Sequence, residues 1–193
     1  MWINSTAVAA GVLSVAVTAA VAANAAGTAG HSPIVLVDNT VSVQPPTVAP
    51  GDGSLADGQT LTPFDVDNPA VGNLDPRLLD AIQHAATAAS ADGVVMTITS
   101  GWRSPEFQQR LLDEAVTTYG SMAAARQYVQ TPAASKHVVG QAVDVGGVGA
   151  DQWLIANGAR FGLCQIYANE LWHFELATDA AGNCPALLLN AAG

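Results

Sequence analysis

Histidine and carboxylate side chains gather in two short segments of this chain. His137 and Asp144 lie seven positions apart within the stretch Ser135 to Asp144, and Glu170 stands three positions before His173. Two imidazoles and one carboxylate make up the three protein ligands of a catalytic zinc site that keeps an open position for water. The remaining carboxylate can act as the base beside it. The sequence therefore predicts one zinc ion on His137, Asp144 and His173, with Glu170 as the catalytic base.

The same side chains allow two other interpretations. Two histidines and one carboxylate also bind iron in non-haem oxygenases, where the pattern is H-x-D with a distant histidine on a barrel. Here the histidine and the aspartate are seven residues apart and the predicted strands are too few for that barrel, so zinc is favoured. A lone aspartate would be satisfied by nearby backbone amides, so the prediction depends on the two segments meeting in the fold.

Arg103 lies where a predicted strand ends and a predicted helix begins, which is a usual place for site residues. Its guanidinium could stabilise the negative charge that develops on an amide carbonyl oxygen when the bond is hydrolysed. The alternative is an ordinary arginine paired with a surface carboxylate. Because the chain contains only six basic residues, we favour the functional role.

Helices and strands alternate along the part of the chain that must position these side chains. Helix caps and apolar spacing predict four helices. Counted from the N-cap residue to the residue that ends each helix, they cover 75–90, 104–120, 121–129 and 151–162. Runs of β-branched and apolar residues predict strands over 94–99, 141–145, 163–167 and 172–176. Asp144 then lies on a strand and His137 on the loop before it. The last two strands form a hairpin with Glu170 at its turn.

Composition and charge exclude some partners. The chain of 193 residues has 16 acidic and 6 basic residues, a net charge of -10, and no lysine or arginine before Arg77. A protein that binds the phosphate backbone needs a basic stripe, so we expect no nucleic acid partner.

The N-terminal region predicts export. Residues 1–26 are almost uncharged, rich in alanine and valine, and contain Ala23-Asn24-Ala25, which fits a signal-peptidase site, although the start lacks the usual positive charge. A membrane anchor is the alternative, since this run approaches the length of a spanning helix. Residues 27–70 are rich in proline and glycine and predict a linker, and residues 71–193 form the folded domain.

The chain contains two cysteines, Cys164 and Cys184. In an exported protein we expect them to form one disulfide. The alternative is that Cys164 is a metal ligand, which an oxidising compartment disfavours.

Three motifs together resemble a known family. The pattern Ser135-x-His137-x-x-Gly140-x-Ala142-x-Asp144, followed by Glu170-x-Trp172-His173, is similar to the signature of the zinc D-alanyl-D-alanine carboxypeptidases and dipeptidases of the VanY and VanX type, the M15 peptidases. The segment Ser100-Gly101-Trp102-Arg103-Ser104 resembles the S-G-[YW]-R-S element of that family. The resemblance covers roughly residues 74–177.

This resemblance implies a fold and a role for each site residue. The fold would be a small α+β domain with a central antiparallel sheet flanked by helices, shared with Hedgehog signalling domains. The three ligands named above would bind zinc, and Glu170 would be the base. Arg103 would polarise the substrate carbonyl or stabilise the oxyanion, and Ser135 would help to hold the substrate.

The resemblance also implies a substrate class. Family members cut bonds next to D-amino acids in peptidoglycan stem peptides, so we expect a monomeric D,D-carboxypeptidase that removes terminal D-alanine in the cell wall, the periplasm or outside the cell. A D-Ala-D-Ala dipeptidase and an L-alanyl-D-glutamate endopeptidase remain alternatives within the family. A non-catalytic zinc-binding wall module is the alternative from another class, and the presence of both Glu170 and Arg103 argues against it.

Overall fold

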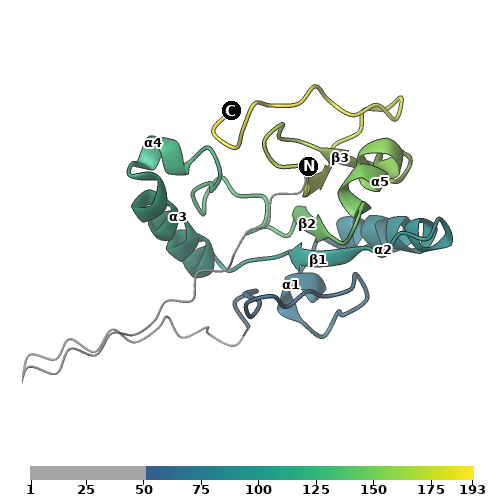
Figure 1. The fold of residues 1–193 in the computed structure, drawn as a ribbon, viewed down its shortest axis with the longest axis horizontal. Coiled ribbons are helices and arrows are strands. Elements are labelled where there is room, and N and C mark those ends of the chain that lie inside the picture. The colour runs from purple at the N-terminus through teal and green to yellow at the C-terminus, as the bar shows by residue number, and fades with distance from the viewer. Residues whose placement is uncertain (1–50) are drawn as a thin grey trace, which may run out of the picture. The chain divides into compact units, whose positions relative to one another are not determined.

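A four-stranded antiparallel sheet lies at the centre of the computed structural model, which describes residues 51–193 (Figure 1). The leader at residues 1–26 and the first part of the predicted linker lie outside the described residues. The strands follow the order β1-β2-β4-β3 across the sheet. They are β1 (Thr97–Ser100), β2 (Ala142–Gly146), β3 (Leu163–Gln165) and β4 (His173–Leu176). The predicted α+β class is confirmed.

Helices surround this sheet, and the caps at Asp75 and Ser104 are as predicted. The helix predicted over 121–129 ends at Ala125, and the one predicted over 151–162 ends at Asn157 and continues as a 3-10 helix. The Asp75 side chain accepts a hydrogen bond from the Arg77 amide, and Ser104 accepts one from the Phe107 amide. Gly120 ends its helix with a positive φ of 77°. The helices are α1 (Pro69–Gly72), α2 (Pro76–Ala91), α3 (Pro105–Tyr119), α4 (Met122–Ala125), α5 (Ala150–Asn157) and the 3-10 helix η1 (Gly158–Phe161).

One predicted cap is wrong. Helix α5 has Gly149 as its N-cap, with a φ of 77°, and Asp151 lies inside the first turn. There the Asp151 carboxylate accepts a hydrogen bond from the amide of Gln152. Asp151 still sits at the positive end of the helix dipole, so the residue type fits the first turn as well as it fits a cap.

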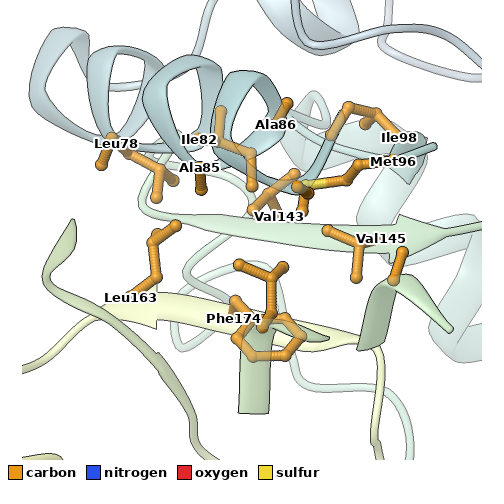
Figure 2. Packing of buried hydrophobic residues seen from close by; sticks show 14 of the residues in the cluster. Leu78, Ile82, Ala85, Ala86, Met96, Ile98, Val143, Val145, Leu163 and Phe174 are labelled. Atoms are coloured by element: carbon orange, nitrogen blue, oxygen red, sulfur yellow. The ribbon is translucent and has the colours of Figure 1, made fainter. Parts of the chain in front are cut away.

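One face of the sheet packs against the apolar core, and the other carries the polar residues of interest. Val143 and Val145 of β2 and Phe174 of β4 point to the face that α2 covers, and they join the main apolar core there (Figure 2). Because side chains alternate along a strand, Asp144 and His173 point to the opposite face. The core thus fixes one face of β2 and β4, and the polar residues of interest occupy the other.

Residues 51–70 are packed against the domain, which corrects the predicted linker boundary at residue 70. Leu61 forms an isolated antiparallel bridge with Ile98 of β1. Ala70 in α1 is fully buried, and its carbonyl accepts a hydrogen bond from the Trp102 amide. The backbone carbonyl of Asp52 accepts another from the Ser104 amide. The prolines and glycines of this segment therefore belong to turns that pack against the domain.

The C-terminal residues are fastened to the same domain. Cys164 and Cys184 form a disulfide, as predicted. Tyr167 and Leu188 form a parallel bridge further along. Within residues 51–193 no helix has the length and the hydropathy that a bilayer crossing requires.

Candidate metal centre and active site

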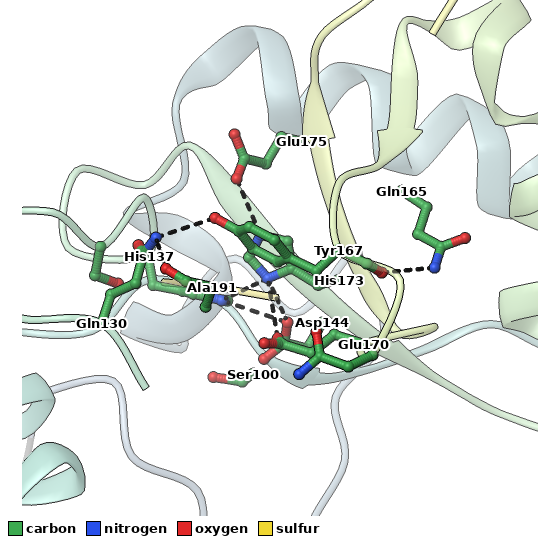
Figure 3. Close-up of polar contacts among 12 residues, drawn as sticks. Ser100, Gln130, His137, Asp144, Gln165, Tyr167, Glu170, His173, Glu175 and Ala191 are labelled. Atoms are coloured by element: carbon green, nitrogen blue, oxygen red, sulfur yellow. Dashed lines mark hydrogen bonds and ion pairs between the residues drawn. The ribbon is translucent and has the colours of Figure 1, made fainter. Parts of the chain in front are cut away.

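Two neighbouring strands bring the predicted ligands together. Asp144 of β2 lies directly opposite His173 of β4 in the antiparallel register, so their side chains share one face of the sheet. His137 reaches them from the loop that precedes β2, and all three side chains are buried (Figure 3). The structure therefore places the two sequence segments at one point, as the sequence analysis requires.

The distances between the ligand atoms fit a tetrahedral metal. His137 Nε2 lies 3.3 Å from His173 Nδ1 and 3.3 Å from Asp144 Oδ1. His173 Nδ1 lies 3.1 Å from the same oxygen. Ligands bound to zinc at about 2.0–2.1 Å in a tetrahedron are about 3.3–3.4 Å apart. The spacing of the three atoms is close to that of three corners of a zinc site.

The hydrogen bonds of the two imidazoles point their lone pairs at one another. His137 Nδ1 lies 2.7 Å from the carbonyl oxygen of Gly101, and His173 Nε2 lies 3.0 Å from Glu175 Oε1. Each of these nitrogens is the donor, because its partner is an acceptor. In the neutral form of each ring the other nitrogen carries a lone pair, and both lone pairs face the carboxylate of Asp144. Three such atoms in contact require a cation among them, which is either a proton between His173 and Asp144 or a metal ion.

The electrostatics of the site also favour positive charge beside Asp144. Burial alone would raise the pKa of the Asp144 carboxyl, but His137, His173 and Arg103 hold it well below its usual range. Burial alone would lower the pKa of His173, but hydrogen bonds to Asp144 and Glu175 raise it to about 9. Without a metal, His173 therefore carries a proton on Nδ1 toward Asp144, and a bound metal would take the place of that proton. Burial lowers the pKa of His137, so its ring is neutral, as a metal ligand must be.

Arg103 contacts the ligand carboxylate itself. Its Nη2 donates to Asp144 Oδ2 at 2.9 Å, which leaves Oδ1 of that carboxylate for the histidines. Its Nε donates to Ser100 Oγ at 2.8 Å, and its Nη1 donates to Gln108 Oε1 at 3.1 Å. The register between β1 and β2 shifts between Ile98 and Ser100, and this irregularity places Ser100 opposite Asp144. The observed contacts of Arg103 orient a ligand, and its predicted action on a substrate oxyanion stays a prediction.

Glu170 lies beside the ligands and does not belong to the cluster. It is buried, its Oε1 has no hydrogen-bond partner, and its Oε2 lies 4.0 Å from His173 Nδ1. Burial raises the pKa of Glu170 to about 7. A carboxylate with a free oxygen and a pKa near neutrality is suited to take up and release a proton.

These residues line a cavity of about 230 Å³. Ser135, predicted to hold substrate, lies in it, is buried, and donates from Oγ to Gln108 Oε1 at 3.2 Å. Polar and aromatic side chains make up much of the remaining lining, namely Gln108, Gln130, Tyr128, Tyr167 and Trp172.

The groups that orient the histidines were not predicted from the sequence. Glu175 follows His173 by two positions in a strand, so alternation alone places both on one face, and that signal was present in the sequence. The carbonyl of Gly101 gave no such signal, because a backbone oxygen can be assigned as an acceptor only once the fold is known.

Comparisons with known proteins agree with this geometry. Residues 72–178 match the model of the VanY family, described as D-alanyl-D-alanine carboxypeptidase. A D-alanyl-D-alanine carboxypeptidase of Enterococcus faecalis is 32% identical over 140 residues, which cover 58% of this chain and 52% of that protein. The chain thus spans about half the length of this relative.

Two solved structures share the fold. One is the vancomycin-resistance D,D-pentapeptidase VanY from a VanB-type resistance cassette, a mutant in complex with Zn(II), with 33% identity, a TM-score of 0.50, and coverage of 53% of this chain and 71% of that chain. The other is VanYB in complex with D-alanine-D-alanine, with 31% identity, a TM-score of 0.50, and coverage of 53% and 70%.

Proposed function

Because the chain belongs to the VanY family of D-alanyl-D-alanine carboxypeptidases, we propose that it is a zinc-dependent D,D-carboxypeptidase that releases the terminal D-alanine of peptidoglycan stem peptides. One observation carries the proposal. One potential ligand atom from each of His137, Asp144 and His173 meets the other two in the pocket at 3.1–3.3 Å, beside a buried carboxylate oxygen that has no partner.

Zinc is the metal that this donor set suits best. Two neutral imidazole nitrogens and one carboxylate oxygen are typical ligands of catalytic zinc sites, and the related VanY structure contains Zn(II). When bound, the metal supplies Lewis acidity toward a carbonyl oxygen and toward a water molecule.

Glu170 would move the protons of the reaction. Its carboxylate takes a proton from the attacking water as the water oxygen bonds to the carbonyl carbon of the scissile amide. It then gives that proton to the amide nitrogen, the C–N bond breaks, and the products are D-alanine and a peptide shortened by one residue. A pKa of about 7 matches both steps at neutral pH.

Arg103 and Ser135 would position the reacting groups. The contact of Arg103 with Asp144 Oδ2 holds that carboxylate in one orientation, with Oδ1 toward the histidines. The guanidinium also lines the pocket, so its remaining N–H groups can face the substrate carbonyl as negative charge develops there. The hydroxyl of Ser135, fixed by Gln108, would contact the peptide.

Export to the cell wall fits this reaction. Stem peptides lie outside the cytoplasm, and the Cys164–Cys184 disulfide is typical of an oxidising compartment. We therefore propose that residues 1–26 are a cleaved leader or a membrane anchor. We also propose that the enzyme is a monomer. Mass spectrometry of the N-terminus of the exported protein tests the leader, since an intact first residue would contradict cleavage.

The decisive experiment is product analysis by mass spectrometry. The full chain, loaded with zinc, is incubated with D-Ala-D-Ala, with a stem pentapeptide and with a cross-linked muropeptide. We expect loss of one D-alanine from the pentapeptide. Release from the dipeptide alone would indicate a dipeptidase, and cleavage inside the stem would indicate an endopeptidase. No cleavage with stoichiometric zinc would favour a binding module.

A Glu170→Gln variant tests the assigned base. It should retain about one zinc per chain and lose about 10²- to 10⁴-fold in kcat, because the amide cannot accept the proton of water. Glu114→Gln is a matched control, since Glu114 is exposed on α3. Unchanged turnover of Glu170→Gln would rule out this residue as the base.

A further inference from the structure

The C-terminal tail, residues 184–193, lies outside the part of the chain that matches the family model. Three attachments nevertheless fix it beside the catalytic pocket. Cys184 is bonded to Cys164 of β3. The Leu188 amide donates to the Ile166 carbonyl, and the Leu188 carbonyl accepts from the Ala168 amide, each at 2.8–2.9 Å. The tail is therefore bonded to the turn between β3 and β4, which also carries Glu170.

The end of the tail reaches the opposite side of the pocket. The Ala191 amide donates to the Gln127 carbonyl at 3.3 Å. The side-chain amide of Gln130 donates both to the Ala191 carbonyl at 3.0 Å and to the Tyr167 hydroxyl at 3.1 Å (Figure 3). Ala191 is 8% exposed and lines the pocket. The tail thus connects the β3–β4 turn with the loop that follows α4.

The pocket residues that are bonded to the tail, or adjacent in sequence to Gln130, carry no charge. Tyr128, Val129 and Tyr167 line this wall of the pocket together with Ala191, whose side chain is a single methyl group. Among the described residues that line the pocket, Arg103 is the only arginine or lysine, and its guanidinium is bonded to Asp144. This wall therefore offers no cation to an acidic side chain, and the one acidic group on the adjoining turn that lines the pocket is the base Glu170.

The position of the base indicates which end of the substrate meets this wall. Glu170 must reach the amide nitrogen that leaves, and it lies on the turn to which the tail is bonded. The residue released with that nitrogen then lies on the side of the tail. We propose that the C-terminal tail is a specificity element, in which Ala191 restricts the released residue to a small, uncharged side chain. This inference rests on the carboxypeptidase activity proposed above.

The test compares substrates that differ only in the released residue. Stem pentapeptides ending in glycine, D-alanine or D-leucine are incubated with the full zinc-loaded chain, and kcat/KM is measured for each. We expect the unmodified chain to prefer D-alanine over D-leucine by about tenfold or more, as a few methyl groups at a close wall can discriminate. Ratios between substrates are used because general damage to the enzyme lowers all rates together.

Two substitutions at Ala191 should change these ratios in opposite ways. Ala191→Gly removes the methyl group from the wall, so the D-leucine to D-alanine ratio should rise by about tenfold. Ala191→Phe puts a bulky ring into the space beside the released residue. The ratio of kcat/KM for D-alanine to that for glycine should therefore fall by about tenfold or more. Cys184→Ser releases one attachment of the tail and should act in the direction of Ala191→Gly. Leu189→Ala is the control, because Leu189 is 79% exposed and does not line the pocket.

A second readout does not depend on turnover. The dissociation constants of the uncleaved pentapeptides, measured on the Glu170→Gln background, should follow the same order. Ratios that stay unchanged in both Ala191 variants would overturn the proposal. A second peptide series keeps D-alanine at the end and varies only the penultimate residue. Ratios that change in this series alone would overturn the assignment to the released residue. No hydrolysis by the unmodified chain would overturn the proposed function and, with it, this inference.

Discussion

Glu175→Ala should weaken zinc binding without removing any ligand. In the structure Glu175 Oε1 lies 3.0 Å from His173 Nε2, and both side chains are buried or nearly so, with 13% and 6% exposed. The substitution leaves a buried N–H without an acceptor and frees the ring to rotate or to change tautomer. A hydrogen bond to a charged group contributes about 1.5–3 kcal/mol. Since each 1.4 kcal/mol is tenfold, the zinc affinity should fall about 10- to 100-fold.

Competition with a chromophoric zinc chelator measures this change. Glu175→Gln is the matched variant, because its amide oxygen can still accept from His173 Nε2, and it should lose less affinity than Glu175→Ala. Glu114→Ala on the exposed side of α3 should leave the affinity unchanged. If the zinc affinity of Glu175→Ala is within about twofold of that of the unmodified chain, the hydrogen bond from His173 to Glu175 does not determine zinc affinity.

Three further variants test the parts of the fold that support the site. Although burial opposes it, hydrogen bonds from Ser54 and Arg110 lower the pKa of the Asp52 carboxyl. The stability that Asp52 contributes is therefore present above its unfolded pKa of about 4 and is lost as the pH falls through its folded value. Asp52→Asn should lower the free energy of unfolding by about 1–3 kcal/mol at pH 7. Urea titrations should show a smaller difference between the variant and the unmodified chain at pH 3. An equal difference at both pH values would contradict this prediction. Gly101→Ala brings a methyl carbon into overlap with the Ala70 carbonyl oxygen, so it should lower the free energy of unfolding by about 1–3 kcal/mol. It should also lower zinc affinity, because the Gly101 carbonyl holds His137. Unchanged thermal unfolding and zinc titration would refute this prediction. Replacing both cysteines by serine opens a loop with a sequence separation of 20 and should lower the free energy of unfolding by about 3 kcal/mol on the chain-entropy model, which calorimetry can check; an unchanged melting temperature would show that the crosslink does not stabilise the fold.

The ligand cluster could be predicted from the sequence because each ligand lies in a short motif whose structure is local. Asp144 and His173 occupy regular strands, where alternation sets the face, and the two strands flank a common core through Val143 and Phe174. His137 belongs to the same motif as Asp144. The helix caps at Asp75 and Ser104 were predictable for the same reason, since a cap is a contact between residues two or three apart.

Contacts between distant segments could not be predicted in this way. Residues 51–70 have the composition of a linker, yet Ala70 is buried because Gly101 allows close backbone approach. Nothing in the sequence of the tail indicates that Ala191 meets Gln130, because one alanine in an irregular segment has no pattern. The cap of α5 was predicted wrongly for a local reason: Asp151 has a familiar capping side chain, but the N-cap is Gly149, which adopts a positive φ.

The pairing of β2 with β4 links metal capture to correct folding. Asp144 faces His173 in the same register in which Val143 faces Phe174. A slip of one residue would turn β4 over, so that Phe174 would enter the site and His173 would enter the apolar core. The ligands therefore assemble only in the register that also completes the core. A bound zinc ion would then favour the correct strand register, because it would stabilise the correctly paired fold and not a fold in which β4 has slipped by one residue.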